Sequence, residues 1–106
     1  GDSNLHRAAR LGQLSTAKQL IRSGASVSAI NDKGDTPLHQ AAQESKIAML
    51  EALVHCGASI SPRNKEGDTP LHQAARYGEM ATVKCLIRLG ASLSATNNEV
   101  RLLFIH

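Results

Sequence analysis

The chain has 106 residues, 42% of them hydrophobic, and a formal net charge of +3 at pH 7. This length suits one domain with a single core, and the only aromatic residues, Tyr77 and Phe104, predict that the core is aliphatic. Positive and negative side chains alternate, which argues against nucleic-acid binding, and no apolar run of about eighteen residues indicates a membrane span. Because no secretion signal is recognisable either, we expect an intracellular protein.

An internal repeat dominates the sequence. The segment GDTPLHQAA occurs at residues 34–42 and again at residues 67–75, 33 positions later. Aligned at this period, the chain divides into units at 1–33, 34–66 and 67–99, followed by a tail at 100–106. A fixed period of this size indicates a stacked array, in which each unit buries its apolar face against its neighbours.

Each unit is predicted to begin with a short helix. Thr36 and Thr69 suit the N-cap position, where a hydroxyl accepts a hydrogen bond from the helix backbone. Pro37 and Pro70 follow them at the first helical position, where a missing N–H loses no hydrogen bond. We expect this helix to end near a turn-forming residue in each unit, namely Gly12, Ser45 and Gly78.

A second helix is predicted after the turn, because apolar residues recur there at helical spacing. The stripe comprises Ile47, Leu50, Leu53 and Val54 in one unit and Met80, Val83, Leu86 and Ile87 in the next. The second helix should end at Gly24, Gly57 and Gly90. Polar segments with the sequences NDKGD and NKEGD come next, and their composition favours tight, projecting turns.

The motif G-x-T-P-L-H-x-A-A at a 33-residue period resembles the ankyrin repeat, and the resemblance covers residues 1–99. It implies an all-α solenoid of stacked antiparallel helix pairs with projecting β-hairpin loops, with one ankyrin repeat in each unit. In that family the motif histidine forms hydrogen bonds near the start of the helix. The resemblance therefore implies structural roles for His39 with Thr36, for His72 with Thr69, and for His6 with Ser3.

The sequence departs from the family pattern at two places. Ser45 stands where glycine is usual, so the turn between the helices of the second unit is expected to be strained. The tail VRLLFIH starts no fourth copy, and we expect Leu102, Leu103 and Phe104 to cover the third unit as an improvised cap. The tail could instead be a clone end, or it could pack on another molecule, so self-association is an alternative to the expected monomer.

No catalytic or metal site is predicted. The recurring histidines would lie about 8–10 Å apart in a stack, too far to share a metal ion with bonds of about 2 Å. Cys56 and Cys85 have no histidine or acidic partner at a suitable spacing, and we interpret both as buried free thiols. Phosphate-binding and nucleophile motifs do not occur, so we expect neither an enzyme nor a cofactor.

Binding is the expected function, because the positions that differ between the units gather on one face. We predict that this concave face, formed by the first helices and the loop tips, binds a partner protein or peptide. The helix positions are Arg10, Leu11, Gln43, Glu44, Arg76 and Tyr77, and the loop positions are Ile30, Asp32, Lys33, Asp35, Arg63, Lys65, Glu66 and Asp68.

Tyrosine and arginine are enriched at binding hot spots, so Tyr77 and Arg76 are the strongest candidates on this face. Together with Arg10 they favour a partner with acidic groups. The alternative is a structural spacer, or a designed repeat scaffold, that has no dedicated ligand.

Overall fold

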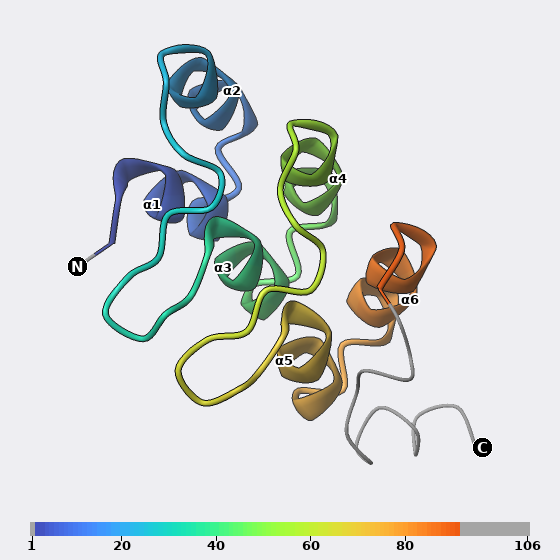
Figure 1. Cartoon of the computed structure of the whole chain (residues 1–106). Helices are drawn as coiled ribbons and strands as arrows, with labels where there is room; N and C mark the ends of the chain where they lie inside the picture. Colours follow the sequence, from blue (N-terminus) through green and yellow to red (C-terminus); the bar gives the residue numbers. More distant parts are fainter. Residues whose placement is uncertain (1, 92–106) are drawn as a thin grey trace.

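The computed structural model describes residues 2–91, which form six helices joined by turns and loops. In chain order the helices are α1 (Asn4–Leu11), α2 (Leu14–Arg22), α3 (Pro37–Gln43), α4 (Ile47–His55), α5 (Pro70–Arg76) and α6 (Met80–Arg88). Figure 1 shows α1, α3 and α5 in one row and α2, α4 and α6 in a second row, with long loops projecting from the first row. The predicted all-α stack of helix pairs is confirmed.

The first helix of each pair begins in the same way. The Thr36 hydroxyl accepts a hydrogen bond from the His39 backbone N–H, and His39 Nδ1 accepts one from the Thr36 N–H at 3.1 Å. Thr69 with His72, and Ser3 with His6, repeat this reciprocal arrangement. Each pairing satisfies two backbone donors that would otherwise lack a partner.

Two of these histidines, His6 and His39, also connect their repeat to the next one. His6 Nε2 lies 2.6 Å from the backbone oxygen of Asp35, and His39 Nε2 lies 2.8 Å from that of Asp68. Because Nδ1 accepts a hydrogen bond from a backbone N–H, the ring proton is on Nε2, which donates to the carbonyl. Both ring nitrogens of each histidine are therefore engaged in hydrogen bonds.

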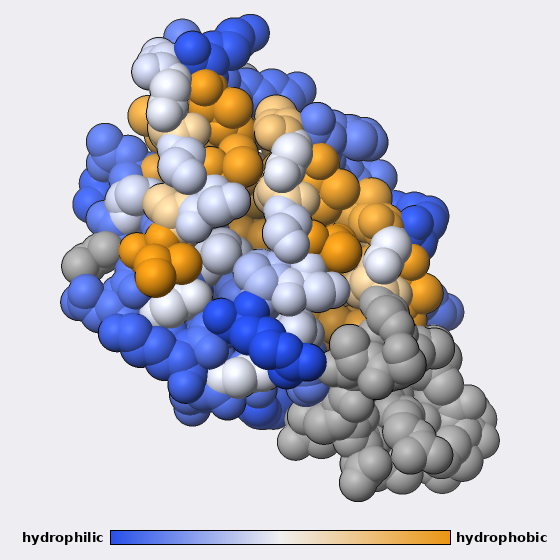
Figure 2. Space-filling model, viewed as in Figure 1, coloured by the Kyte–Doolittle hydropathy of each residue, from blue (hydrophilic) through white to orange (hydrophobic). Residues whose placement is uncertain are grey.

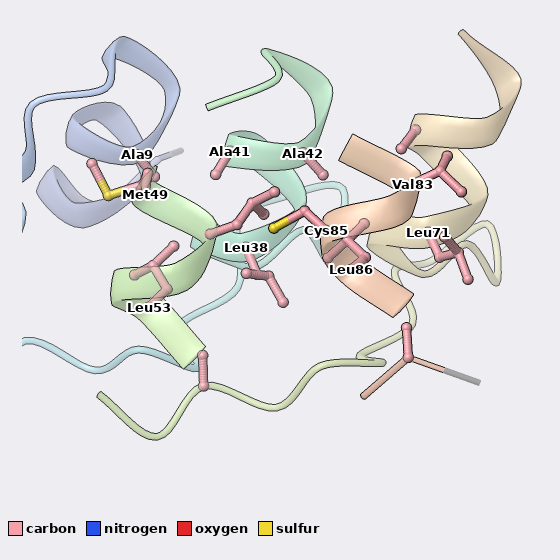
Figure 3. Close-up of a cluster of buried hydrophobic side chains, with 14 of the residues drawn as sticks. Ala9, Leu38, Ala41, Ala42, Met49, Leu53, Leu71, Val83, Cys85 and Leu86 are labelled. Atoms are coloured by element: carbon pink, nitrogen blue, oxygen red, sulfur yellow. The ribbon is translucent and has the colours of Figure 1, made fainter. Parts of the chain in front are cut away.

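Leucine and alanine fill the core between the two rows of helices (Figure 3). Leu38 and Leu53 are almost completely buried, as are the alanine pairs on the first helices, such as Ala41 and Ala42. Small side chains let α1, α3 and α5 pack closely, and leucines from these helices fill the core together with larger residues of α4 and α6. The core is continuous from one repeat to the next, as expected for a stacked array.

The projecting loops contain tight turns closed by backbone hydrogen bonds. In the first loop the Asn31 N–H donates to the Asp35 backbone oxygen at 3.1 Å, and no strand is assigned anywhere in residues 2–91. The expected β-hairpins are therefore not confirmed in the described residues. A backbone hydrogen bond from Lys65 to Lys33, 3.0 Å long, joins the two loops, and a Cβ atom at Gly34 would lie 2.8 Å from the Lys65 nitrogen.

The two cysteines differ in their exposure to solvent. Cys85 is buried as predicted, but Cys56 is exposed, because it follows the last turn of α4 at the surface. The predicted cap formed by Leu102, Leu103 and Phe104 lies outside the described residues. The limits of the units at residues 33, 66 and 99 stay predictions.

Ser45 occupies a backbone conformation that normally requires glycine. Its φ is 54°, whereas the equivalent Gly12 and Gly78 have φ values of 73° and 68°. A side chain in this left-handed region costs about 1 kcal/mol relative to glycine. The strain expected from the sequence is therefore located at this residue.

Replacing Ser45 by glycine is expected to raise the free energy of unfolding by about 0.5–1 kcal/mol, because the substitution removes the left-handed strain. Chemical denaturation followed by circular dichroism measures the change. The reverse substitution Gly78→Ser is the matched control, since an added Cβ would meet no atom within 4 Å and only the backbone strain should count. A stabilising effect of Gly78→Ser would contradict this explanation.

Candidate partner-binding surface

The ends of the first helices carry large exposed side chains. Leu11 ends α1 and Tyr77 caps α5, at equivalent positions of the first and third repeats, and their exposed fractions are 53% and 63%. Glu44 holds the same position in the middle repeat and is also exposed. Among the described residues, the remaining large apolar side chain with high exposure is Ile30, in the first projecting loop.

Both arginines predicted to attract an acidic partner are paired within their own repeats. Arg10 Nη1 lies 2.8 Å from Asp2 Oδ2, and Arg76 Nη1 lies 3.0 Å from Asp68 Oδ2. The hydrogen bond from Asn31, and then the Arg10 guanidinium, lower the pKa of Asp2 below its ordinary value. Each arginine is therefore partly neutralised before any partner arrives, which weakens the argument for acidic groups on that partner.

The middle repeat has glutamine at the arginine position. Gln43 and Gln40 each point an amide nitrogen at Asp35 Oδ2, but both N···O distances are 3.5 Å. The other carboxylate oxygen of Asp35 accepts a 2.9 Å hydrogen bond from Asn64 in the next loop. Asp35 has no cationic partner among the residues that the structure describes.

Asp35 and Asp68 do not lie at the loop tips, contrary to our expectation. Their exposed fractions are 1% and 8%, because both side chains turn inward against the first helices. Their hydrogen bonds to Gln43 and Arg76 fix the loops to the first helices. The tips instead expose Asp32, Lys33, Lys65 and Glu66, and Figure 2 shows that the projecting loops are mainly hydrophilic.

A hollow lies between the first loop and the start of the stack. Its volume is about 270 Å³, and it is open to solvent. We call it the Gln43 pocket; it is lined by Asp2, Arg10, Asn31, Asp32, Lys33, Gln40 and Gln43. Several of the predicted concave-face residues, from two repeats and one loop, therefore meet around a single polar pocket.

Other chemically active side chains have structural partners. Burial raises the pKa of the Cys85 thiol, which makes it a poor nucleophile, and Arg88 Nη2 lies 3.6 Å from its sulfur.

Within residues 2–91 no three histidine, cysteine or acidic side chains are grouped so as to hold a metal ion. No helix in that part of the chain is long and apolar enough to cross a membrane.

The stacked helix pairs and the exposed, non-repeating side chains on one face define a helical repeat protein. The family model described as ankyrin repeats, in three copies, matches residues 5–97, and the chain belongs to the ankyrin repeat family. Ankyrin repeats are generally protein–protein interaction modules and are typically non-catalytic. A search of curated proteins found no match to this chain.

Proposed function

We propose that this chain binds a partner protein or peptide through the concave face formed by the first helices and the loop tips. The observation that carries the proposal is the pair of exposed apolar residues, Leu11 and Tyr77, at equivalent ends of α1 and α5. Isolated solvent-facing apolar residues are common, but a large aromatic side chain on a fixed helix end is typical of a binding hot spot.

The frame beneath these residues supports the proposal. Capping boxes fix the start of each first helix, and the ion pair between Arg76 and Asp68 holds the end of α5 to the beginning of its own repeat. Tyr77 therefore stands on a constrained support, and little conformational entropy would be lost when a partner covers it.

The test is a comparison of captured proteins. Tyr77→Ser should lower the retention of a concave-face partner from cell lysate about tenfold or more, because the main apolar contact is lost. Lys84→Ser, at an exposed position on α6, is the matched control and should retain the partner. Both variants should first show the melting temperature of the parent chain.

The same experiment distinguishes the alternative function. A spacer or scaffold without a dedicated ligand would give identical captures from the parent chain, Tyr77→Ser and Lys84→Ser. A partner lost only with Lys84→Ser would move the interface to the second helices and end the proposal for the concave face.

A further inference from the structure

The three repeats hold equivalent aspartates in different ways. Asp2 and Asp68 each form an ion pair with an arginine eight positions later, at 2.8 and 3.0 Å. Asp35 has Gln43 at that position. The middle repeat thus keeps the aspartate of the pattern but lacks its arginine.

Asp35 is left with weak hydrogen bonding on one oxygen. Asn64 donates to Oδ1 at 2.9 Å, whereas Oδ2 receives, from the residues that the structure describes, only the two amide nitrogens at 3.5 Å, the outer limit of a hydrogen bond. Since this side chain is only 1% exposed, bulk water compensates poorly for the missing partner. A cation that reached Oδ2 would therefore gain a strong, charge-assisted hydrogen bond.

Such a cation would approach through the Gln43 pocket, which Asp35 itself does not line because Gln40 and Gln43 stand beside its carboxylate. The Gln43 pocket, of about 270 Å³, opens beside the two glutamines that contact Asp35 Oδ2. Gln43 is only half-buried, so its amide can turn aside and offer its carbonyl oxygen to an incoming group. Two cationic residues, Arg10 and Lys33, line the pocket together with two acidic ones, Asp2 and Asp32, so the charges of the lining residues balance. Arg10 is already engaged by Asp2, which limits its repulsion of a further cation.

We propose that the Gln43 pocket binds the guanidinium of an arginine from the partner protein, with Asp35 Oδ2 and the Gln43 carbonyl as acceptors. A planar guanidinium presents a fork of donors that can serve both acceptors, whereas a lysine ammonium is a point charge. The partner's arginine would take the place of the arginine that the first and third repeats supply themselves. The inference rests on the proposed function, because it assigns part of the concave face to one chemical group.

The first test introduces the missing arginine into the middle repeat itself. Gln43→Arg should raise the melting temperature by about 2–6 °C, by forming the ion pair seen in the neighbouring repeats. Gln19→Arg makes the same chemical change at an exposed position of α2 and should leave the melting temperature unchanged.

The second test uses defined peptides and NMR spectroscopy. Acetyl-Gly-Arg-Gly-amide should cause saturable shifts in the side-chain amide signals of Gln43 and Asn64, with a Kd in the millimolar range. The matching lysine peptide should bind more weakly, and the glutamine peptide should cause no saturable shift. Gln43→Arg should abolish the response to the arginine peptide, and Gln19→Arg should keep it.

Absence of saturable shifts with the arginine peptide would overturn the proposal, whatever the melting temperatures show. Equal responses to all three peptides would also overturn it, because the pocket would then not recognise a guanidinium. Either failure leaves the Tyr77→Ser capture experiment intact, so the concave face could still be the interface. The parent chain and Tyr77→Ser could instead capture the same proteins while the arginine peptide still gives a specific response. That result would remove the proposed function and leave a guanidinium-binding pocket.

Discussion

Leu53→Ala is expected to lower the free energy of unfolding by about 2–5 kcal/mol. Leu53 lies on α4, in the middle of the stack, and is completely buried. Removing its isobutyl group loses the transfer free energy of the side chain and leaves a cavity that packed neighbours on both sides cannot fill. Urea denaturation of the parent chain and the variant measures the difference.

Leu20→Ala is the matched control, because Leu20 is the equivalent residue in the first repeat and is only half-buried. With a neighbouring repeat on one side only, its loss should destabilise the chain by roughly half as much or less. Equal losses for the two variants would contradict the assignment of Leu53 to the centre of a continuous core.

His39→Ala is expected to have the second large effect, lowering the free energy of unfolding by about 2–4 kcal/mol. The imidazole satisfies the Thr36 backbone N–H on one side and the Asp68 carbonyl on the other, and it has no exposed surface. The alanine variant leaves both backbone groups buried without partners and opens a cavity between two repeats. Thermal denaturation should show a clear loss of stability. A loss smaller than that for Gly78→Ser would rule out a main role of His39 in coupling the repeats.

The same residue predicts a dependence of stability on pH. Burial lowers the pKa of His39 below its ordinary value, although its hydrogen bond to the Asp68 carbonyl and the nearby carboxylates of Asp35 and Asp68 act in the opposite direction. The unfolded chain therefore binds the proton more readily, so the contribution of His39 is complete above about pH 6.5 and falls as the pH decreases below it. The variant His39→Gln should show a flatter stability profile between about pH 7 and pH 5.5 than the parent chain.

Much of the fold could be predicted because its signals are local and occur more than once. The capping threonine, the proline after it and the apolar stripe of the second helix act within a few residues, and the 33-residue period then fixes how the units stack. Ser45 could be identified as strained for the same reason, since glycine stands at the equivalent position in the other two repeats.

The candidate surface could be predicted only in part. Exposure of Tyr77 follows from its place at the end of a short helix, but burial of Asp35 depends on Asn64, 29 residues later in the next loop. The pairing of Arg10 with Asp2 was also missed. An eight-residue interval between aspartate and arginine, present in the first and third units, was the available signal.

The contacts between the two projecting loops would transmit the effect of a bound ligand from one repeat to the next. The backbone hydrogen bond from Lys65 to Lys33 and the side-chain bond from Asn64 to Asp35 make the loops one mechanical unit. A ligand that touches only the first loop would therefore reduce the motion of the second. Amide hydrogen exchange should then slow at Lys65, which belongs to the next repeat.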